Sequence, residues 1–340
     1  MRRFQKFHTS GWKVRVLTLN SLGAHLLPGD VPPPCFARLP DTKKSDWVRL
    51  YMVSTYGGVW CDASIILTKP LEWIITKADF VGYHMDGWQS EGMPKIVESW
   101  CFGAPRGSPF VTAWFEEFDR AMRTGDLNAY VDAVAPTLDL MNFPKAFLSH
   151  LAVYVSAQRV LQAEGADYNL DLRPSQDGPF STAAAVKWDA DVLADVLATS
   201  PTPPHIEMIK LTGEMRKAVD ARLIRHGAMA NSTLGILFCN DDASNGRGGH
   251  HQKSRAPRGS HRPQVPPPLK MALNAPVVVP KTWTAPMDPS MQSYRQQASQ
   301  MHSTTQVGYM HPAAHESMGA YTQQTPAMVP AASPTQFHTA

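Results

Sequence analysis

The stretch SDWVRLYMVSTYGGVWCDASIIL, from Ser45 to Leu67, carries the signals that decide the fold. Ser45 is typical of a helix N-cap, and Asp46 would then be the first helical residue, where a carboxylate suits the helix dipole. A stripe of buried side chains at helical spacing is predicted to follow, formed by Trp47, Leu50, Tyr51 and Ser54. The Gly57-Gly58 pair is predicted to end the helix, because glycine adopts the C-terminal cap conformation without steric cost.

The second half of the stretch reads as a strand, Val59–Leu67, with a polar interruption that begins at Asp62. Asp62 would lie at the carboxyl end of a strand, where open α/β sheets bind their ligands. Asp46 and Arg49 are three positions apart and share a helix face, so we expect both acids and the guanidinium to meet. Carboxylates accept hydrogen bonds from hydroxyls, and arginine donates to hydroxyl or phosphate oxygens, so the pattern predicts a polar ligand site.

Further strands and helices are predicted on both sides of this stretch. The strands are expected at residues 12–19, 79–84, 99–105 and 206–211, and the helices at 20–27, 109–123, 145–162, 184–198 and 218–226. Strands that alternate with helices indicate an α/β fold with a mostly parallel central sheet.

The composition of the chain changes near residue 240. Residues 241–340 are rich in Pro, Gln, Ser, Thr, Met and His, so they cannot bury enough apolar surface and are predicted to be a disordered tail. Residues 1–240 are long enough for one α/β domain. The net charge is +3, and its basic excess falls in the tail, which argues against nucleic-acid binding by the domain.

Other common signals are missing from the sequence. The four cysteines are widely spaced and form no zinc-binding pattern, so they require neither a metal site nor a disulfide. No apolar run is long enough for a transmembrane helix, and no signal peptide is visible.

The pattern SDxxR followed by YGGxWxDAS resembles the signature of the capsular-polysaccharide-synthesis glycosyltransferases. These are related to DXD-type sugar transferases, which include the fungal initiating mannosyltransferases and the clostridial glucosylating toxins. The resemblance implies a GT-A-like nucleotide-diphospho-sugar transferase fold. It also implies transfer of a hexose from a nucleotide-sugar donor to a glycan, lipid-linked or protein acceptor, with retention of the anomeric configuration.

The resemblance also assigns roles to five residues. Asp46 and Arg49 would contact the donor sugar, and Asp62 would contact the ribose and a divalent cation, Mn²⁺ or Mg²⁺. Ser64 stands at the third position of the DXD motif and would be the second metal ligand, although a hydroxyl is a poorer ligand than a carboxylate for a hard cation. Lys210 matches a lysine of a later block and would reach a phosphate. Asp46, Arg49 and Asp62 are the expected catalytic residues, and all five are expected to bind substrate.

The chain departs from the family pattern at its beginning. Family members usually open with a strand of the type IPKxIWQxW, and this sequence begins after it. We therefore expect a missing first strand, which would leave edges of the sheet open. Eukaryotic relatives usually work behind an amino-terminal anchor, so the resemblance implies the Golgi lumen if an anchor precedes Met1, and the cytoplasm otherwise.

Simpler explanations compete with these roles. Asp46 alone would usually be a helix-capping acid, Arg49 a partner in a surface salt bridge and Asp62 a turn residue. Trp47 and Trp60 are expected in the core rather than as stacking platforms. The alternative function is a non-catalytic nucleotide-sugar or glycan binding protein derived from a truncated glycosyltransferase. The tail 241–340 is a candidate interaction segment in either case.

Overall fold

A computed structural model describes residues 12–140, 143, 148, 150–238 and 275–280. The chain divides into two compact units, residues 1–287 and 288–340, and all the described residues belong to the first. The predicted tail therefore lies outside the described residues except for 275–280. Among the residues described, no helix combines the length and the apolar character needed to cross a membrane.

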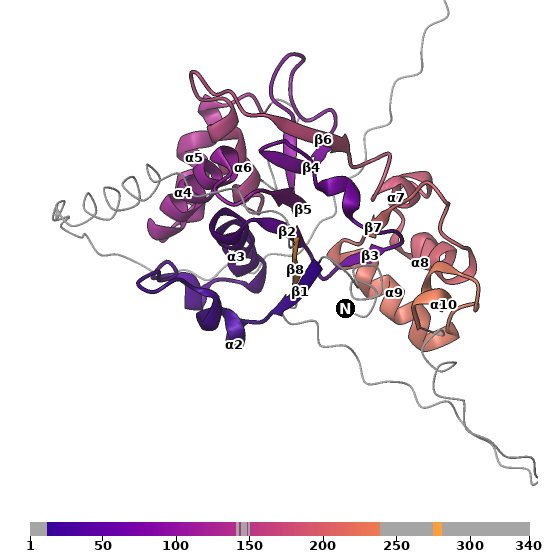
Figure 1. The fold of residues 1–340 in the computed structure, drawn as a ribbon. Helices are drawn as coiled ribbons and strands as arrows, with labels where there is room; N and C mark the ends of the chain where they lie inside the picture. Colours follow the sequence, from indigo (N-terminus) through magenta and orange to yellow (C-terminus); the bar gives the residue numbers. More distant parts are fainter. Residues whose placement is uncertain (1–11, 141–142, 144–147, 149, 239–274, 281–340) are drawn as a thin grey trace, which may run out of the picture. The chain divides into compact units, whose positions relative to one another are not determined.

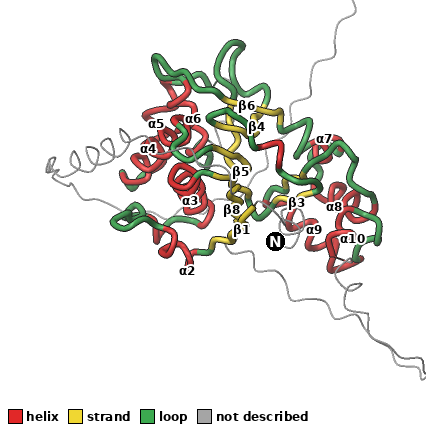
Figure 2. Tube along the Cα trace, in the orientation of Figure 1, coloured by secondary structure: helices red, strands yellow, loops and turns green. Residues whose placement is uncertain are grey.

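Eight strands form two sheets in the described part of the chain, shown in Figure 2. The strands are β1 Trp12–Leu17, β2 Gly58–Cys61, β3 Ile65–Leu67, β4 Phe80–Met85, β5 Ile96–Ala104, β6 Leu170–Pro174, β7 Met208–Lys210 and β8 Ala275–Pro280. The larger sheet has six strands in the order β1-β8-β2-β5-β4-β6, and β3 pairs with β7 in a second sheet.

The prediction of a mostly parallel sheet is wrong. Only β4 and β6 pair in parallel among the described strands, and the other neighbours in the two sheets are antiparallel. The prediction assumed that helices connect successive strands. Residues 86–95, however, join β4 to β5 without a helix, and such a short connection reverses the chain direction. The architecture is thus mixed α/β.

The helices are α2 Leu19–Leu22, α3 Asp41–Tyr56, α4 Pro109–Arg123, α5 Leu127–Val134, α6 Ala152–Leu161, α7 Ser181–Ala185, α8 Ala190–Thr199, α9 Gly213–His226 and α10 Thr233–Phe238. Short 3₁₀ turns lie at η1 Gly23–His25, η2 Phe36–Arg38, η3 Glu72–Ile74 and η4 Ala135–Thr137. Helix α4 agrees with its predicted range, while the predicted helix 184–198 is divided into α7 and α8. The division falls at Lys187 and Trp188, which have left-handed backbone angles, φ 53° and 64°.

The two faces of the six-stranded sheet pack against different layers (Figure 1). Trp60, Phe80 and Phe102 face a core that contains buried residues of α3, α4 and α6. Val59 and Val81 face the opposite way and pack with apolar residues of β3 and β7. Successive residues of a strand point to opposite faces, so each central strand contributes to both cores.

Helix α3 begins earlier than predicted, so Ser45 is not its N-cap and Asp46 is not its first residue. Pro40 occupies the N-cap position, and its carbonyl accepts hydrogen bonds from the backbone N–H groups of Lys43 and Lys44. Asp46 therefore lies inside the helix, away from the free N–H groups of its first turn. The predicted apolar stripe is buried as expected, and Gly57 caps the helix with φ 66°.

Strand β8 lies within the residues predicted to be a disordered tail. Its sequence, APVVVP, contains three consecutive β-branched valines, which favour a strand. It pairs with β1 along its whole length and with β2 through Val277 and Val278. Strand β8 therefore lies between β1 and β2 in the six-stranded sheet.

Candidate functional site

A cavity of about 790 Å³ opens among segments that are far apart in the sequence. Its walls come from α3, the turn between β2 and β3, strand β5, helix α6 and the start of α9. All five residues assigned to the site from the sequence line it: Asp46, Arg49, Asp62, Ser64 and Lys210. The predicted convergence of the two acids and the guanidinium is therefore present, within one cavity.

Asp62 follows the last residue of β2 and is the best connected acid of the cavity. Its Oδ1 accepts a hydrogen bond from Trp60 Nε1 at 2.9 Å and lies 3.3 Å from Arg49 Nη2. Its Oδ2 accepts a hydrogen bond from Lys210 Nζ at 2.7 Å. Burial alone would raise the pKa of this carboxyl, but the charges of Arg49 and Lys210 and the hydrogen bonds outweigh burial and hold it below its usual value. Asp62 therefore stays ionised.

Arg49 connects helix α3 to both acids. Its Nη2 lies 3.2 Å from Asp46 Oδ1 and 3.3 Å from Asp62 Oδ1, so one guanidinium nitrogen bridges the two carboxylates. Its Nη1 donates to Ser99 Oγ at 2.6 Å, and its Nε donates to the Ser45 carbonyl at 3.3 Å. This arrangement uses most of the arginine's donors and fixes the spacing of the two acids.

Asp46 is buried but less engaged than Asp62. Besides Arg49, its charged neighbour is Lys43, whose Nζ lies 3.8 Å from Asp46 Oδ2, beyond hydrogen-bond distance. Burial raises the pKa of Asp46 above its usual value, although Arg49 and Lys43 act in the opposite direction. A carboxylate has about four lone-pair positions, so Asp46 keeps acceptor capacity for hydroxyl groups in the cavity.

Lys210 is brought to Asp62 by strand pairing. β7 pairs with β3 so that Lys210 lies opposite Ile65, three residues after Asp62. The ammonium donates to Asp62 Oδ2 and to Ser64 Oγ, both at 2.7 Å, and lies 5.7 Å from the ring centroid of Trp100. Lys210 thus occupies the position between the two side chains that were expected to hold a cation.

The donor set does not fit the divalent cation expected from the DXD-like motif. Such a cation usually keeps several waters and binds one or two carboxylates together with substrate phosphates, so its few protein oxygens must be free to ligate it. At this position the chain offers one carboxylate, Asp62, and one hydroxyl, Ser64, and both are bonded to Lys210. Across the described residues, no group of three or more His, Cys, Asp or Glu side chains is placed to hold a metal ion.

Sequence reasoning missed a buried acid in the cavity wall, Glu98 of β5. Its Oε2 accepts a hydrogen bond from the Tyr154 hydroxyl at 2.6 Å, and its Oε1 lies 3.5 Å from Ser175 Oγ. Burial raises the pKa of Glu98 above its usual value, although these hydrogen bonds oppose the shift. The only local signal was a charged residue within an apolar strand, which is unusual unless the charge is paired.

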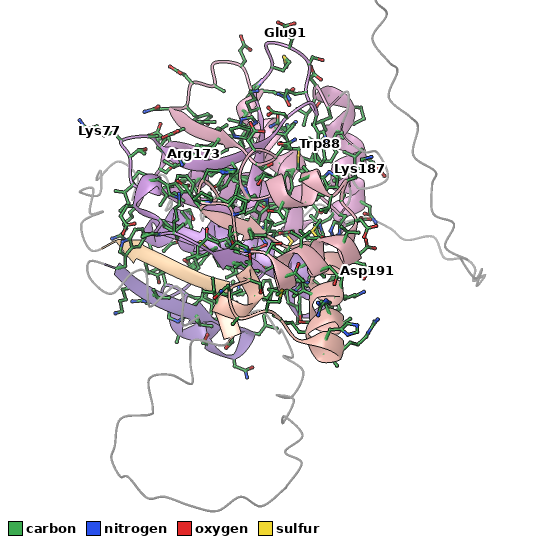
Figure 3. All side chains as sticks on the ribbon, turned by 90° about the vertical axis from the view of Figure 1, so that its right-hand side faces the viewer. Lys77, Trp88, Glu91, Arg173, Lys187 and Asp191 are labelled. Carbon is green, nitrogen blue, oxygen red and sulfur yellow. The ribbon has the colours of Figure 1, made fainter. Side chains whose placement is uncertain are left out.

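Aromatic residues also line the cavity. Trp88, which Figure 3 labels, and Trp188 contribute to its walls, and Trp188 remains 41% exposed. Trp188 also has a left-handed backbone, with φ 64°, which is uncommon for a bulky residue. Trp47 and Trp60 are buried in the core, as predicted, but the indole of Trp60 also fixes the orientation of Asp62.

Comparison with known proteins gives one family match and one curated relative. Residues 5–119 match the family described as Capsular polysaccharide synthesis protein. The O-glycosyltransferase braB of Annulohypoxylon truncatum is 27% identical over 113 residues, which cover 29% of this chain and 27% of that protein. No solved structure gives a significant match. The resemblance to the capsular polysaccharide synthesis family is therefore confirmed for the stretch that carries Asp46, Arg49, Asp62 and Ser64.

Proposed function

We propose that this chain is a glycosyltransferase that moves a hexose from a nucleoside diphosphate to an acceptor hydroxyl with retention of configuration. The observation that carries the proposal is the convergence of Asp46, Arg49, Asp62 and Lys210 on one cavity. The site offers carboxylates for hydroxyl groups beside a lysine for a phosphate, which is the combination that a nucleotide sugar requires. A GT-A type of fold is part of the proposal.

The contacts of each residue suggest its role. Asp46 has free acceptor capacity and would bind hydroxyls of the donor sugar. Asp62 accepts two hydrogen bonds and forms an ion pair with Arg49, which leaves acceptor capacity for a ribose hydroxyl. Arg49 would fix the positions of the two carboxylates, and its N–H groups would have little capacity left for a direct hydrogen bond to the substrate. Lys210 would face the diphosphate, together with the first turn of α9, whose N–H groups have no partners within the helix.

The reaction breaks the bond between the sugar C1 and the oxygen of the diphosphate, and the electron pair leaves with that oxygen. A new bond forms between C1 and the acceptor oxygen on the same face of the sugar. The acceptor's proton passes to the departing diphosphate, so the products are the glycosylated acceptor and a nucleoside diphosphate. The developing negative charge on the leaving oxygen is the charge that the site must stabilise.

Donor turnover tests this function. Purified protein would be incubated with UDP- and GDP-hexoses and simple saccharide acceptors, and released nucleotide and transferred sugar would be measured. We expect Asp62→Asn and Asp46→Ala each to lower turnover about 100-fold or more, as is typical when one group that stabilises the transition state is removed. The matched control is Asp220→Asn, because Asp220 is an exposed acid of α9 that does not line the cavity.

The outcomes separate the two functions considered for the sequence. Turnover lost in both site variants but kept in Asp220→Asn supports the transferase, and NMR of the product's anomeric proton reports retention. Full activity in folded Asp62→Asn would remove the assigned role of Asp62. Binding of a nucleotide sugar without turnover by the wild-type protein would favour the non-catalytic binding protein.

A further inference from the structure

The place expected for a metal ion in this site contains a positive charge from the chain itself. Lys210 Nζ lies 2.7 Å from Asp62 Oδ2 and 2.7 Å from Ser64 Oγ, the two side chains of the DXD-like motif that would ligate a cation. Lys210 is 148 positions from Asp62 and lies outside the family match at residues 5–119. The pairing of β3 with β7 thus delivers a cation that the motif alone does not contain.

We propose that the Lys210 ammonium takes the place of a divalent cation, so that this site binds a diphosphate without a metal ion. The inference rests on the proposed function and adds to it the source of the positive charge. Asp62 and Ser64 would then orient Lys210 rather than coordinate a metal.

The hydrogen bonds of Lys210 leave room for this role. An ammonium has three N–H donors, and among the described residues Asp62 and Ser64 accept two of them. The third donor is available for a phosphate oxygen, because Lys210 lines the cavity. Charged hydrogen bonds of this kind are shorter and stronger than neutral ones. Two fixed acceptors therefore hold the third N–H toward the ligand without further ordering of the side chain.

A metal ion would meet two obstacles at the same position. If the ion displaced Lys210 from both oxygens, a buried ammonium would be left without its acceptors. If Lys210 stayed, two positive charges would lie within a few ångströms of each other in a partly buried cavity, where repulsion is poorly screened. A second carboxylate could offset these costs, but the third position of the motif is Ser64.

Other cations are near enough to complete the charge of the site. Arg49 lies 3.3 Å from Asp62 and 3.2 Å from Asp46, so the charge of Asp62 is shared between Arg49 and Lys210. Arg216 of α9 also lines the cavity. The diphosphate would thus enter beside the Lys210 ammonium and the first turn of α9.

Calorimetric titration of the full-length protein with UDP and GDP tests the inference. One series contains EDTA and the other MnCl₂. We expect the dissociation constant of the nucleotide that binds to agree within about twofold between the series. Lys210→Met should weaken binding about tenfold or more in both series, because it removes the charged hydrogen bond to the phosphate. Lys217→Met, at an exposed position of α9 outside the cavity, should bind like the wild type.

Lys210→Arg is a second variant, included because Lys210→Met could lose binding simply by failing to fold. It keeps a positive charge and several donors beside Asp62 and Ser64, and it should bind the nucleotide in EDTA with most of the wild-type affinity. Thermal unfolding would verify that each variant is folded. Electron paramagnetic resonance of Mn²⁺ provides a readout that needs no nucleotide, and we expect the wild-type protein to leave the signal of free Mn²⁺ unchanged.

The inference would be overturned, while the proposed function stands, by nucleotide binding that requires Mn²⁺ or by stoichiometric Mn²⁺ uptake by the wild-type protein. Wild-type affinity in folded Lys210→Met would overturn it as well. If neither UDP nor GDP binds in either series, the proposed function fails together with the inference, so the two failures are distinguishable.

Discussion

At the scale of single residues, the same guanidinium leaves the two acids beside it in different electrostatic states. Arg49 contacts both Asp46 and Asp62, but only Asp62 also accepts hydrogen bonds from Lys210 and Trp60. Burial prevails at Asp46 and raises its pKa, whereas the added partners prevail at Asp62 and lower its pKa. Environments that move the pKa values of two acids apart are a common way to give them separate roles.

Glu98 allows a test of burial at this scale. Its pKa is raised above the usual value of 4.5, mainly by burial, so its native form holds a proton more tightly than the unfolded chain does. This stabilisation is complete below pH 4.5 and is lost as the pH rises through the native pKa. Glu98→Gln removes the titration but keeps an oxygen to accept the hydrogen bond of Tyr154.

We therefore expect the unfolding free energy of the wild type to fall relative to that of Glu98→Gln as the pH rises above 4.5. Urea unfolding of both proteins at a series of pH values measures this difference. Tyr154→Phe is the companion variant: the hydrogen bond from Tyr154 lowers the pKa of Glu98, so its removal should move the pH-dependent change to higher pH. A difference that does not vary with pH would contradict the assigned burial effect.

At the scale of elements, the sequence predicted what depends on local pattern and failed where distant segments decide. The start of α4 was predictable because Ser108 caps the helix and Pro109 begins it. The end of α3 was predictable from Gly57, because glycine readily adopts the positive φ of a helix C-cap. The structure adds a second reason for glycine: a Cβ at this position would lie 2.5 Å from the backbone nitrogen of Arg106. The direction of strand pairing was not predictable, because it depends on whether a connection carries a helix that the local sequence does not specify.

Strand β8 was missed for the same reason, and it leads to a prediction about truncation. Within the described residues, β8 is the strand that pairs with β1, and it also pairs with β2, so its removal would leave two strand edges open. Its contacts with β2 fall at Val277 and Val278, between two prolines that cannot donate ladder hydrogen bonds. In the described part of the chain, only Val277 and Val278 of β8 pair with strands on both sides, so the prolines at the two flanks do not have to donate hydrogen bonds to β2.

Deleting residues 275–340 should lower the unfolding free energy, by about 1 kcal/mol for each ladder hydrogen bond lost, whereas deleting residues 281–340 should not. The two truncations differ only by β8, so the second is the matched control for the first. Thermal unfolding followed by circular dichroism measures the effect, and an aggregation assay would report the open edges. Equal melting temperatures for the two truncated proteins would show that β8 contributes nothing to the sheet.

At the scale of the whole molecule, the candidate site depends on segments that the chain brings together from a long distance. Asp46, Arg49 and Asp62 could be predicted to meet because they lie on a helix and the strand that follows it. The contact with Lys210 could not be derived from spacing, since it requires the register of β7 against β3. The role of Lys210 was accessible only through resemblance, and the lysine's bonds to Asp62 and Ser64 were not expected at all.

Because the cavity extends from Asp41 to Arg216, a ligand that fills it should stabilise the whole fold by mass action. Such a ligand at 100 times its dissociation constant adds about 2.7 kcal/mol. For a domain of this size that corresponds to about 5–10 °C in melting temperature. We expect UDP or GDP to produce this shift, and the matching nucleotide sugar to produce a larger one because it also reaches Asp46.

Asp46→Ala separates the two parts of the ligand in the same measurement. The variant should keep the shift caused by the nucleotide and lose the additional shift caused by the sugar, because Asp46 is assigned to the sugar hydroxyls. Asp220→Asn, on the exposed side of α9, should show both shifts. A sugar-dependent shift that survives in Asp46→Ala would place the hexose elsewhere in the cavity. Unfolding separates the segments that line the cavity, so the ligand-induced shift in melting temperature depends on the contacts of each segment. Comparing the shifts of the variants therefore identifies which residues bind the nucleotide and which bind the sugar.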